Sequence, residues 1–369
     1  MNLKKKIAQM LIMGFSGQEV AQDSPVSKWI AEEGIGGVIL FDYDLANKTY
    51  GKNLSNRNQI QELNATLQHL AKLNDELPLF IAIDYEGGAV DRLKHIQDCI
   101  KTMPASELVK LPEAELCAEI EKMASTVQQL GFNLNFAPVV DLNLSADAGI
   151  IGKLGRSFSA NPQLVAHAAG LFIKIFSQYG IVTSYKHFPG HGSASGDTHH
   201  GFVDVSDSFE NIELDPYKLL QNYTTPTMVM TAHVINRKLD KSGLPATLSH
   251  NILTGLLRHE LGFNGVIVSD DLQMNAISEH FSLQDSLRLT LNAGADMLIF
   301  ANQLGTISPV EVIQHVEQLV LSGAVAEQRI HEAYQRVVLL KQQMLSLTAP
   351  LGAGHTAKSY ETDKIHVKM

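Results

Sequence analysis

Short apolar runs alternate with longer amphipathic stretches along the whole chain. Eight runs are rich in Val, Ile, Leu and Phe, at residues 11–15, 37–41, 79–84, 134–141, 182–188, 228–233, 266–270 and 297–300. Most of them are continuously apolar, which is typical of strands that are buried on both faces of a sheet. The stretches between them follow the helical period, such as residues 251–261, which Ser249 precedes and Gly262 follows as expected start and stop signals.

Eight strand–helix units in a chain of 369 residues predict a fold of the α/β class, a single (β/α)8 TIM barrel. The alternative is a doubly wound open sheet, which would carry a G-x-G-x-x-G phosphate loop after its first strand. Residues 14–17 read G-F-S-G instead, so that signal is missing. We expect the barrel to occupy residues 1–347 and a C-terminal tail without helical period to occupy residues 348–369.

Composition limits the expected partners and location. The net charge is −10, whereas nucleic acids and anionic membranes bind basic surfaces, so neither is expected as a partner. No apolar run reaches the roughly 18 residues of a transmembrane helix, and two cysteines are too few for a disulfide framework. Lysines at positions 4–6 precede an apolar stretch, as in a signal peptide, but Gln9 interrupts it and no A-x-A site follows. We therefore expect a cytoplasmic protein; we also expect it to be a monomer.

Reactive side chains gather at the carboxyl ends of five predicted strands, where TIM barrels carry their active sites. These are Asp84 and Glu86, Asp141, Lys186 and His187, His233, and Asp270 and Asp271. A buried charge is costly without a partner, so packing explains these residues poorly. Five such strand ends on one face of one barrel predict a polar active site there.

The loop after the fifth strand, residues 186–200, reads K-H-F-P-G-H-G-S-A-S-G-D-T-H-H. Its three glycines give the backbone the freedom that a mobile loop needs. Asp197 and His199 are two residues apart and can face the same side. A carboxylate beside a histidine fixes the tautomer of the ring and favours the imidazolium form, which indicates a general acid and base that works near neutral pH.

The motif K-H-F-P-G-H-G at 186–192, followed by D-T-H at 197–199, resembles the signature of β-N-acetylhexosaminidases in glycoside hydrolase family 3. D-x-E-G-G at 84–88, G-R-S-F at 155–158 and S-D-D-L-x-M at 269–274 resemble the other motifs of this family, in the same order. The resemblance covers roughly residues 7–340. It implies a retaining hydrolase without metal or cofactor, in which Asp270 is the nucleophile and His199, oriented by Asp197, is the acid and base.

The resemblance also implies which residues hold the sugar hydroxyls and the N-acetyl group, namely Asp84, Arg92, Arg156, Lys186 and His187. It extends to the cytoplasmic bacterial enzymes of peptidoglycan recycling, which remove N-acetylglucosamine from 1,6-anhydro-N-acetylmuramic acid peptides, so a small carbohydrate or muropeptide is the expected substrate. Two departures stand out. Residues 42–45 read D-Y-D-L where relatives often read F-x-R-N, and Ala89 stands where an arginine is common. Both lie where the mouth of the pocket, and hence the choice of leaving group, is expected.

Alternatives from other classes remain open. A metal-dependent hydrolase could use a ligand cluster of His187, His191, His199, His200, His233 and Asp270, although the first strand lacks the usual H-x-H pair. A sugar-binding barrel without catalysis would lack Asp270 or His199, and both are present. A β-glucosidase or xylosidase of the family would lack the Asp197–His199 loop. Transfer to phosphate instead of water is not decided by the sequence.

Several residues at the predicted mouth are expected to support the site. His191 and His200 are expected to shape the loop, and Asp141 to lie behind the substrate contacts. His233 is equally compatible with a substrate contact and with a hydrogen-bonded support. Glu86 is the alternative acid if the pair of Asp197 and His199 is not catalytic.

Overall fold

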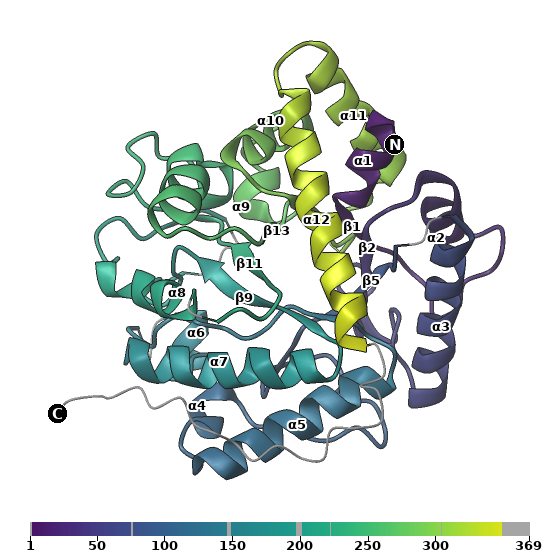
Figure 1. Cartoon of the computed structure of the whole chain (residues 1–369). Coiled ribbons are helices and arrows are strands. Elements are labelled where there is room, and N and C mark those ends of the chain that lie inside the picture. The colour runs from purple at the N-terminus through teal and green to yellow at the C-terminus, as the bar shows by residue number, and fades with distance from the viewer. Residues whose placement is uncertain are drawn as a thin grey trace.

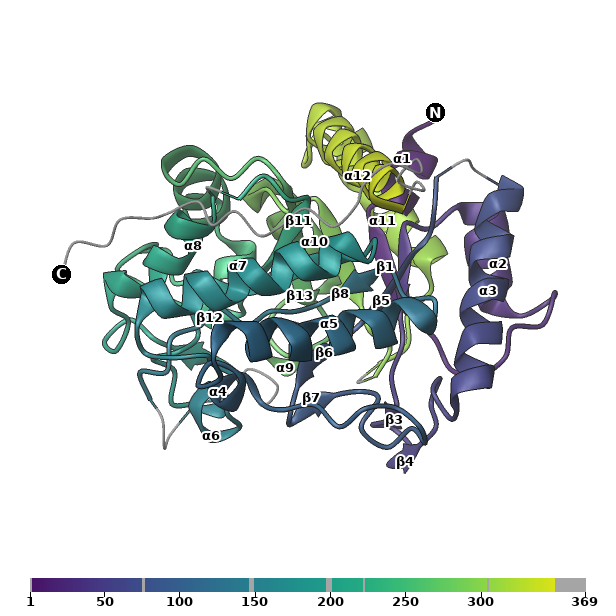
Figure 2. The same ribbon diagram turned by 60° about the horizontal axis from the view of Figure 1, so that its bottom comes forward.

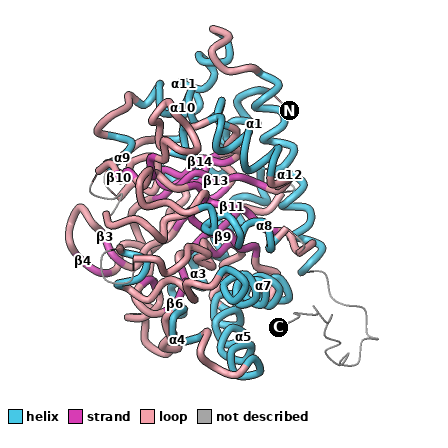
Figure 3. Tube along the Cα trace, turned by 90° about the vertical axis from the view of Figure 1, so that its left-hand side faces the viewer, coloured by secondary structure: helices cyan, strands magenta, loops and turns pink. Residues whose placement is uncertain are grey.

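The computed structural model describes residues 2–74, 77–145, 149–196, 201–221, 223–303 and 305–348. Eight parallel strands close into a barrel in the order β1-β14-β13-β11-β9-β8-β5-β2, and helices surround it (Figures 1 and 3). This confirms the predicted (β/α)8 barrel. The strands are β1 (Leu11–Gly14), β2 (Gly37–Ile39), β5 (Phe80–Ile83), β8 (Leu134–Asn135), β9 (Val182–Phe188), β11 (Thr227–Thr231), β13 (Val266–Asp271) and β14 (Met297–Phe300).

Each predicted apolar run contributes one barrel strand, but the fourth run was predicted too long. Only two residues of run 134–141 form β8, and after them a single bridge joins Val139 to Lys186. Pro138 lies in this segment and has no N–H group to donate to a strand ladder, which explains why the regular strand ends early. The rest of the run still follows the barrel wall and delivers Asp141 to its carboxyl end.

The larger helices have local starting signals. Asn161 caps α7 (Pro162–Gln178) by accepting from the backbone N–H groups of Gln163 and Leu164. Ser249 accepts from the N–H of Ile252 as predicted, but the helix that follows, η5 (Asn251–Glu260), is a π-helix. The other helices are α1 (Leu3–Gln9), α2 (Pro25–Lys28), η1 (Trp29–Glu33), α3 (Arg57–Asn74), α4 (Ala105–Leu108), α5 (Glu113–Gln129), α6 (Ile150–Lys153), η3 (Asn211–Leu214), α8 (Asp215–Leu220), η4 (Ala246–Leu248), α9 (Asn275–Ser278), α10 (Leu283–Ala293), α11 (Pro309–Leu321) and α12 (Glu327–Thr348). None of the helices that the structure describes is both long and apolar enough to cross a bilayer.

The last described helix closes one end of the barrel. Val337, Leu340 and Met344 of α12 pack with the side chains that fill the barrel interior. The buried ammonium of Lys341 donates to Gln9 Oε1 at 2.8 Å and to the carbonyl oxygen of Gly36 at 2.9 Å. Gln9 precedes β1 and Gly36 precedes β2, so α12 covers the amino ends of the strands (Figure 1). The carboxyl ends therefore form the mouth.

Small two-stranded sheets frame the mouth. β3 (Tyr43–Asp44) pairs with β4 (Thr49–Tyr50), and β6 (Tyr85–Gly87) pairs with β7 (Val90–Asp91). A third pair joins β10 (Val203–Asp204) to β12 (Val234–Ile235). Figure 2 shows β3, β4, β6 and β7 together on the side of the molecule that lies away from α12. These additions position side chains around the carboxyl ends of the barrel strands.

Candidate active site

A buried network of opposite charges occupies the mouth between β5 and β9. The Lys186 ammonium lies 2.7 Å from Glu86 Oε1 and 3.2 Å from Asp84 Oδ1. Arg156 donates to both carboxylate oxygens of Glu86 at 2.8 Å, which is the bidentate geometry of a strong ion pair. Three of the predicted sugar-binding residues, Asp84, Arg156 and Lys186, are thus brought together around Glu86.

The glycine after Glu86 lets the backbone turn so that the Glu86 side chain enters the charged network. Glu86 is followed by Gly87, which has a φ of +99°, a conformation that favours glycine. A Cβ atom on Gly87 would also lie 2.4 Å from the carbonyl oxygen of Met103. The E-G-G part of the motif therefore has a local physical reason, because the chain must turn tightly where Glu86 enters the network.

Glu86 is held in its ionised form. Burial raises the pKa of Glu86, but the attraction of Arg156 and Lys186 outweighs burial and holds that pKa well below its usual range. Burial likewise lowers the pKa of Lys186, yet Glu86 and Asp84 more than compensate and raise it. A carboxylate whose two oxygens accept from two cations has no proton to give. This argues against Glu86 as the alternative general acid.

Arg92 extends the network toward the solvent. Its guanidinium lies 3.6 Å from Asp84 Oδ2 and 3.8 Å from Asp42 Oδ1, and 5.5 Å from the centroid of the Phe41 ring. The side chain of Arg92 is 33% exposed and that of Asp84 16% exposed, in contrast to 3% for Glu86. Arg92 and Asp84 therefore present charged groups that a sugar hydroxyl can reach.

His187 is fixed by a buried carboxylate. Asp141 Oδ2 lies 2.7 Å from Nδ1 of His187, and Asp141 Oδ1 accepts from the backbone N–H groups of His187 and His191 at 3.1 and 2.9 Å. Burial raises the pKa of Asp141, but His187 lowers it to a greater extent, so the carboxyl is ionised. Nδ1 of His187 is then the donor, which leaves Nε2 as the ring nitrogen that can meet a ligand. Asp141 has the supporting position that the sequence predicted.

A second buried carboxylate, Glu213, holds the same loop. Glu213 lies in η3, is 1% exposed, and accepts from the backbone N–H groups of Gly192 and Ser193 at 3.0 and 3.3 Å. Burial raises its pKa to about 7, and the nearby charge of Asp141 adds to the rise. Gly190, with a φ of +144°, makes room, because a Cβ there would lie 2.8 Å from Glu213 Oε2. Sequence reasoning missed Glu213, since it follows no strand and belongs to no motif.

Asp270 is the last residue but one of β13, which lies four places away from β5 in the ring of eight strands. It therefore lies across the mouth from Asp84. Its backbone N–H donates to Thr231 Oγ1 at 3.3 Å, and its Oδ1 accepts from the N–H of Asp271 at 2.8 Å. Asp271 instead accepts from the N–H groups of Gln273 and Ala301, both at 3.1 Å, so its carboxylate organises the turn after β13. The two neighbouring carboxylates thus have different surroundings.

His233 supports the backbone next to Asp270. The ring is fully buried, and its Nε2 lies 2.9 Å from the carbonyl oxygen of Asp271, so Nε2 is the donor. Nδ1 then accepts from the Thr247 hydroxyl at 2.7 Å, and that hydroxyl oxygen lies 2.7 Å from Thr231 Oγ1. This chain of contacts begins at Thr231, which accepts from the N–H of Asp270, and ends at the carbonyl oxygen of Asp271. This favours support over substrate contact for His233.

The predicted acid and base fall outside this description. Asp197 and His199, together with His200, lie outside the described residues, which stop at Gly196 and resume at Gly201. The alternative metal cluster also relied on His199 and His200. Within the described part of the chain, no group of three His, Cys, Asp or Glu side chains is placed to hold a metal ion.

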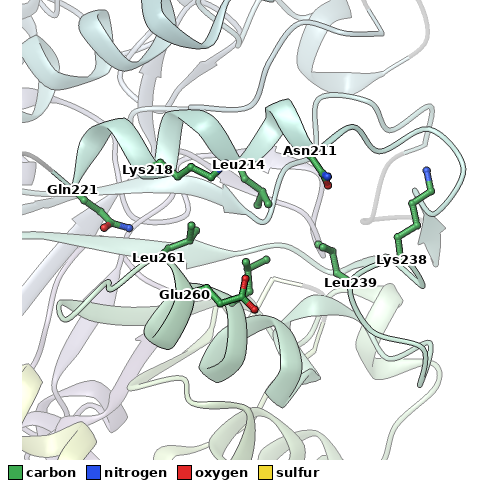
Figure 4. Close-up of a pocket in the computed structure, with 9 residues that line it drawn as sticks. Asn211, Leu214, Lys218, Gln221, Lys238, Leu239, Glu260 and Leu261 are labelled. Carbon is green, nitrogen blue, oxygen red and sulfur yellow. The ribbon is translucent and has the colours of Figure 1, made fainter.

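A groove of about 620 Å³ lies elsewhere, between the segment η3–α8 and the helix η5 (Figure 4). Leu214, Leu239 and Leu261 line it together with Lys218, Lys238 and Glu260. Lys218 pairs with Asp215 at 2.8 Å, and the Lys238 ammonium donates to two backbone carbonyl groups. The groove contains none of the predicted site residues, so the barrel mouth is the candidate active site.

Comparison with known sequences is consistent with this placement. A family profile described as the N terminal domain of glycosyl hydrolase family 3 matches residues 2–340. Beta-hexosaminidase A of Pseudoalteromonas piscicida is 33% identical over 354 residues, which cover 90% of this chain and 57% of that protein. The beta-hexosaminidase of Tolumonas auensis is 35% identical over 286 residues, which cover 76% of this chain and 80% of the relative. The chain thus spans little more than half of the first relative and most of the second.

Solved structures give the same picture. A glycoside hydrolase family 3 beta-N-acetylglucosaminidase from a Paenibacillus species superposes with a TM-score of 0.82 at 33% identity, over 99% of this chain and 66% of the other. A glycosyl hydrolase of the same family from Mycobacterium smegmatis superposes with a TM-score of 0.78 at 28% identity, over 92% of this chain and 97% of the other. With the family profile covering almost all of the barrel, this chain belongs to glycosyl hydrolase family 3.

Proposed function

We propose that the protein is a retaining β-N-acetylhexosaminidase that removes terminal β-linked N-acetylglucosamine. The two relatives compared above are named beta-hexosaminidases, and the Paenibacillus structure is named a beta-N-acetylglucosaminidase. The observation that carries the proposal is the mouth itself. It combines a fixed array of hydrogen-bond donors and acceptors at the ends of β5 and β9 with a carboxylate, Asp270, at the end of β13, across from β5.

The reaction follows from a carboxylate that faces a bound sugar. Asp270 attacks the anomeric carbon, the bond from that carbon to the leaving oxygen breaks, and a covalent glycosyl ester forms on Asp270 with inverted configuration. His199, held by Asp197, gives its proton to the leaving oxygen. It then takes a proton from a water molecule, which attacks the same carbon, releases Asp270 and restores the β configuration.

The charged network sets the sugar specificity in this scheme. Asp84 and Arg92 are partly exposed and contact hydroxyl groups, whereas His187 presents Nε2 to the sugar. Arg156 and Lys186 are locked on Glu86, so their remaining donors point in fixed directions. A site built on such fixed hydrogen bonds rejects sugars that lack the matching groups, because its own polar atoms are then left without partners.

The resemblance of the sequence motifs to those of the peptidoglycan-recycling enzymes leads to a more specific proposal for the natural substrate. The leaving group is 1,6-anhydro-N-acetylmuramic acid with its peptide, water is the acceptor, and the enzyme works as a cytoplasmic monomer without metal. Residues 42–45 and Ala89, which depart from the family motifs, lie at the mouth, so they bear on the choice of leaving group.

One assay tests the activity. The release of p-nitrophenol is compared for the β-N-acetylglucosaminide, the β-glucoside and the β-xyloside. We expect kcat/KM for the acetylated sugar to be higher on the order of 10²-fold or more. Equal rates on the acetylated sugar and the glucoside contradict the proposal, and loss of activity in a chelator favours the metal-dependent alternative. In phosphate buffer, release of free N-acetylglucosamine instead of its 1-phosphate identifies water as the acceptor.

A further inference from the structure

The hairpin β3–β4 carries an exposed aromatic side chain beside the mouth. Tyr50, at the end of β4, is 60% exposed. The other large aromatic side chains that are exposed in the described part of the chain, Phe202 and Tyr223, are 43% and 37% exposed. Figure 2 shows the hairpin standing next to β6 and β7, on the mouth side of the barrel.

The Tyr50 ring is held in place although it is exposed. Tyr43 approaches it at 5.0 Å between ring centroids and at an angle of 70°. His95 approaches it at 4.6 Å and 68°, and His95 Nε2 lies 3.2 Å from the Tyr50 hydroxyl. An exposed ring that is already ordered loses little conformational entropy when a ligand packs on it, so this geometry favours binding.

The backbone below the ring is fixed as well. The N–H of Gly51 donates to the carbonyl oxygen of Asp42 at 2.6 Å. Gln303, in the loop after β14, donates to the carbonyl oxygen of Tyr43 at 2.9 Å and accepts from the N–H of Leu45 at 3.1 Å. The hairpin is therefore tied both to the end of β2 and to a neighbouring barrel loop.

The aromatic cluster borders the sugar-binding network. Tyr43 directly follows Asp42, whose carboxylate lies 3.8 Å from Arg92, and Arg92 lies 3.6 Å from Asp84. His95 follows Arg92 by three positions. The contacts thus lead from Asp84 through Arg92 to Asp42, whose neighbour Tyr43 contacts Tyr50.

We propose that Tyr50 forms the floor of a second sugar subsite, which binds the pyranose ring of the leaving group. The proposal rests on the proposed function and names its substrate class as saccharides whose leaving group is itself a sugar. The C–H groups on the face of a β-linked pyranose carry partial positive charge and pack on the electron-rich face of an aromatic ring. Arg92, whose side chain is 33% exposed and is paired with the buried Asp42, lies between the two subsites and offers a donor to the hydroxyl groups of that ring.

The test compares a substrate that reaches the second subsite with one that does not. The disaccharide N,N′-diacetylchitobiose places a pyranose in the leaving group, whereas N-acetyl-β-glucosaminyl azide has a leaving group too small to reach Tyr50. In Tyr50→Ala we expect kcat/KM for the disaccharide to fall about three- to tenfold, as for the loss of one aromatic contact, with no change for the azide. Tyr50→Phe keeps the ring and is expected to retain the wild-type ratio of the two substrates.

Controls separate the subsite from a general effect of the substitution. Tyr223→Ala removes another exposed tyrosine, outside the mouth, and should change neither rate; thermal melts check that each variant folds. Equal losses of Tyr50→Ala on the disaccharide and on the azide overturn the proposal. If the wild-type protein cleaves neither compound, the proposed function itself fails, and calorimetric titration of the disaccharide into the wild type and Tyr50→Ala then tests the subsite by binding alone.

A further pair of substrates identifies the source of the leaving sugar. A disaccharide that ends in 1,6-anhydro-N-acetylmuramic acid is compared with N,N′-diacetylchitobiose in the wild type and Tyr50→Ala. The subsite predicts that the variant is impaired on at least one of them, and the larger loss identifies the pyranose that packs on Tyr50. Unchanged rates on both disaccharides overturn the proposal.

Discussion

Two buried charge clusters lie at opposite ends of the barrel, and they differ in balance. At the mouth, two carboxylates meet two cations, Lys186 and Arg156. At the base, the fully buried Asp296 alone meets Arg258, Arg329 and Arg336. Asp296 directly precedes β14, so this base cluster lies at the amino ends of the strands.

The carboxylate of the base cluster is fully enclosed, whereas the mouth keeps a carboxylate partly accessible. Asp296 also accepts from the N–H of Ile267, and Arg258 donates to the carbonyl oxygens of Phe263 and Gly265. Burial lowers the pKa of Arg258 to about 10, which is still far above neutral pH. At the mouth, Arg92 and Asp84 remain partly exposed. Buried charge by itself therefore does not indicate function; its position at the carboxyl ends of the strands does.

The largest expected effect is a loss of activity without a loss of stability, on replacement of Asp270 at the mouth. Asp270→Ala should lower kcat by on the order of 10³-fold or more, since the nucleophile is lost, while the thermal midpoint stays close to that of the wild type. A 2-fluoro sugar inactivator followed by peptide mass spectrometry should find the label on Asp270. Labelling of Asp271 or Glu86 instead would remove Asp270 from the mechanism.

The base cluster should show the reverse behaviour. Asp296→Ala leaves Arg258, Arg329 and Arg336 without their shared carboxylate, so we expect the free energy of unfolding to fall by about 3–5 kcal/mol in urea titrations. The specific activity of the folded fraction, measured well below the unfolding transition, should be unchanged. A large loss of activity in molecules that remain folded would mean that the two ends of the barrel are coupled.

Glu213 should make the stability of the fold depend on pH. Its folded pKa of about 7 lies above the ordinary value of 4.5, so the stability that its neutral form contributes is complete below pH 4.5 and is lost as pH rises through 7. Glu213→Gln stays neutral, and its stability relative to the wild type should therefore rise by about 2–3 kcal/mol between pH 4.5 and pH 8, on top of a constant offset. Denaturant titrations at several pH values measure this slope. Parallel curves for the two proteins would show that Glu213 does not titrate in this range.

The smallest effects come from a matched pair of outer arginines. Arg92 at the mouth and Arg336 at the base are 33% and 29% exposed, and each borders its cluster. Replacing either with Ala should cost about 1 kcal/mol of stability or less, because partly exposed ion pairs contribute little. Only Arg92→Ala should raise KM for the acetylated glycoside, by about tenfold, as expected for one lost charged hydrogen bond. Equal kinetics in both variants would remove Arg92 from sugar binding.

Much of the fold could be predicted because barrel strands carry their signal locally. Continuous apolar runs located all eight strands, and the strand ends located Asp84, Lys186 and His187. The early end of β8 and the helix α1 were not predicted, since the first depends on Pro138 within an apolar run and the second precedes a strand without a strong period.

The parts of the site that could not be predicted depend on contacts between distant segments. Glu213 reaches the loop after β9 from a short helix about 20 residues later, and nothing in its own neighbourhood marks it. The same holds for Asp296, whose partners Arg329 and Arg336 follow 33 and 40 positions along the chain. The roles of Asp197 and His199 stay predictions, because these residues lie outside the described part of the chain.

The contact between Lys341 and Gln9 has a consequence for biosynthesis. These residues are 332 positions apart, and β1 also pairs with the last barrel strand, β14. At translation rates of about 5–20 residues per second, roughly 20–70 s pass between the appearance of Gln9 and that of Lys341 at the ribosome. One side of β1 has no partner strand until β14 is made, and the barrel interior has no cover until α12 is made, so the nascent chain exposes apolar surface for most of its synthesis.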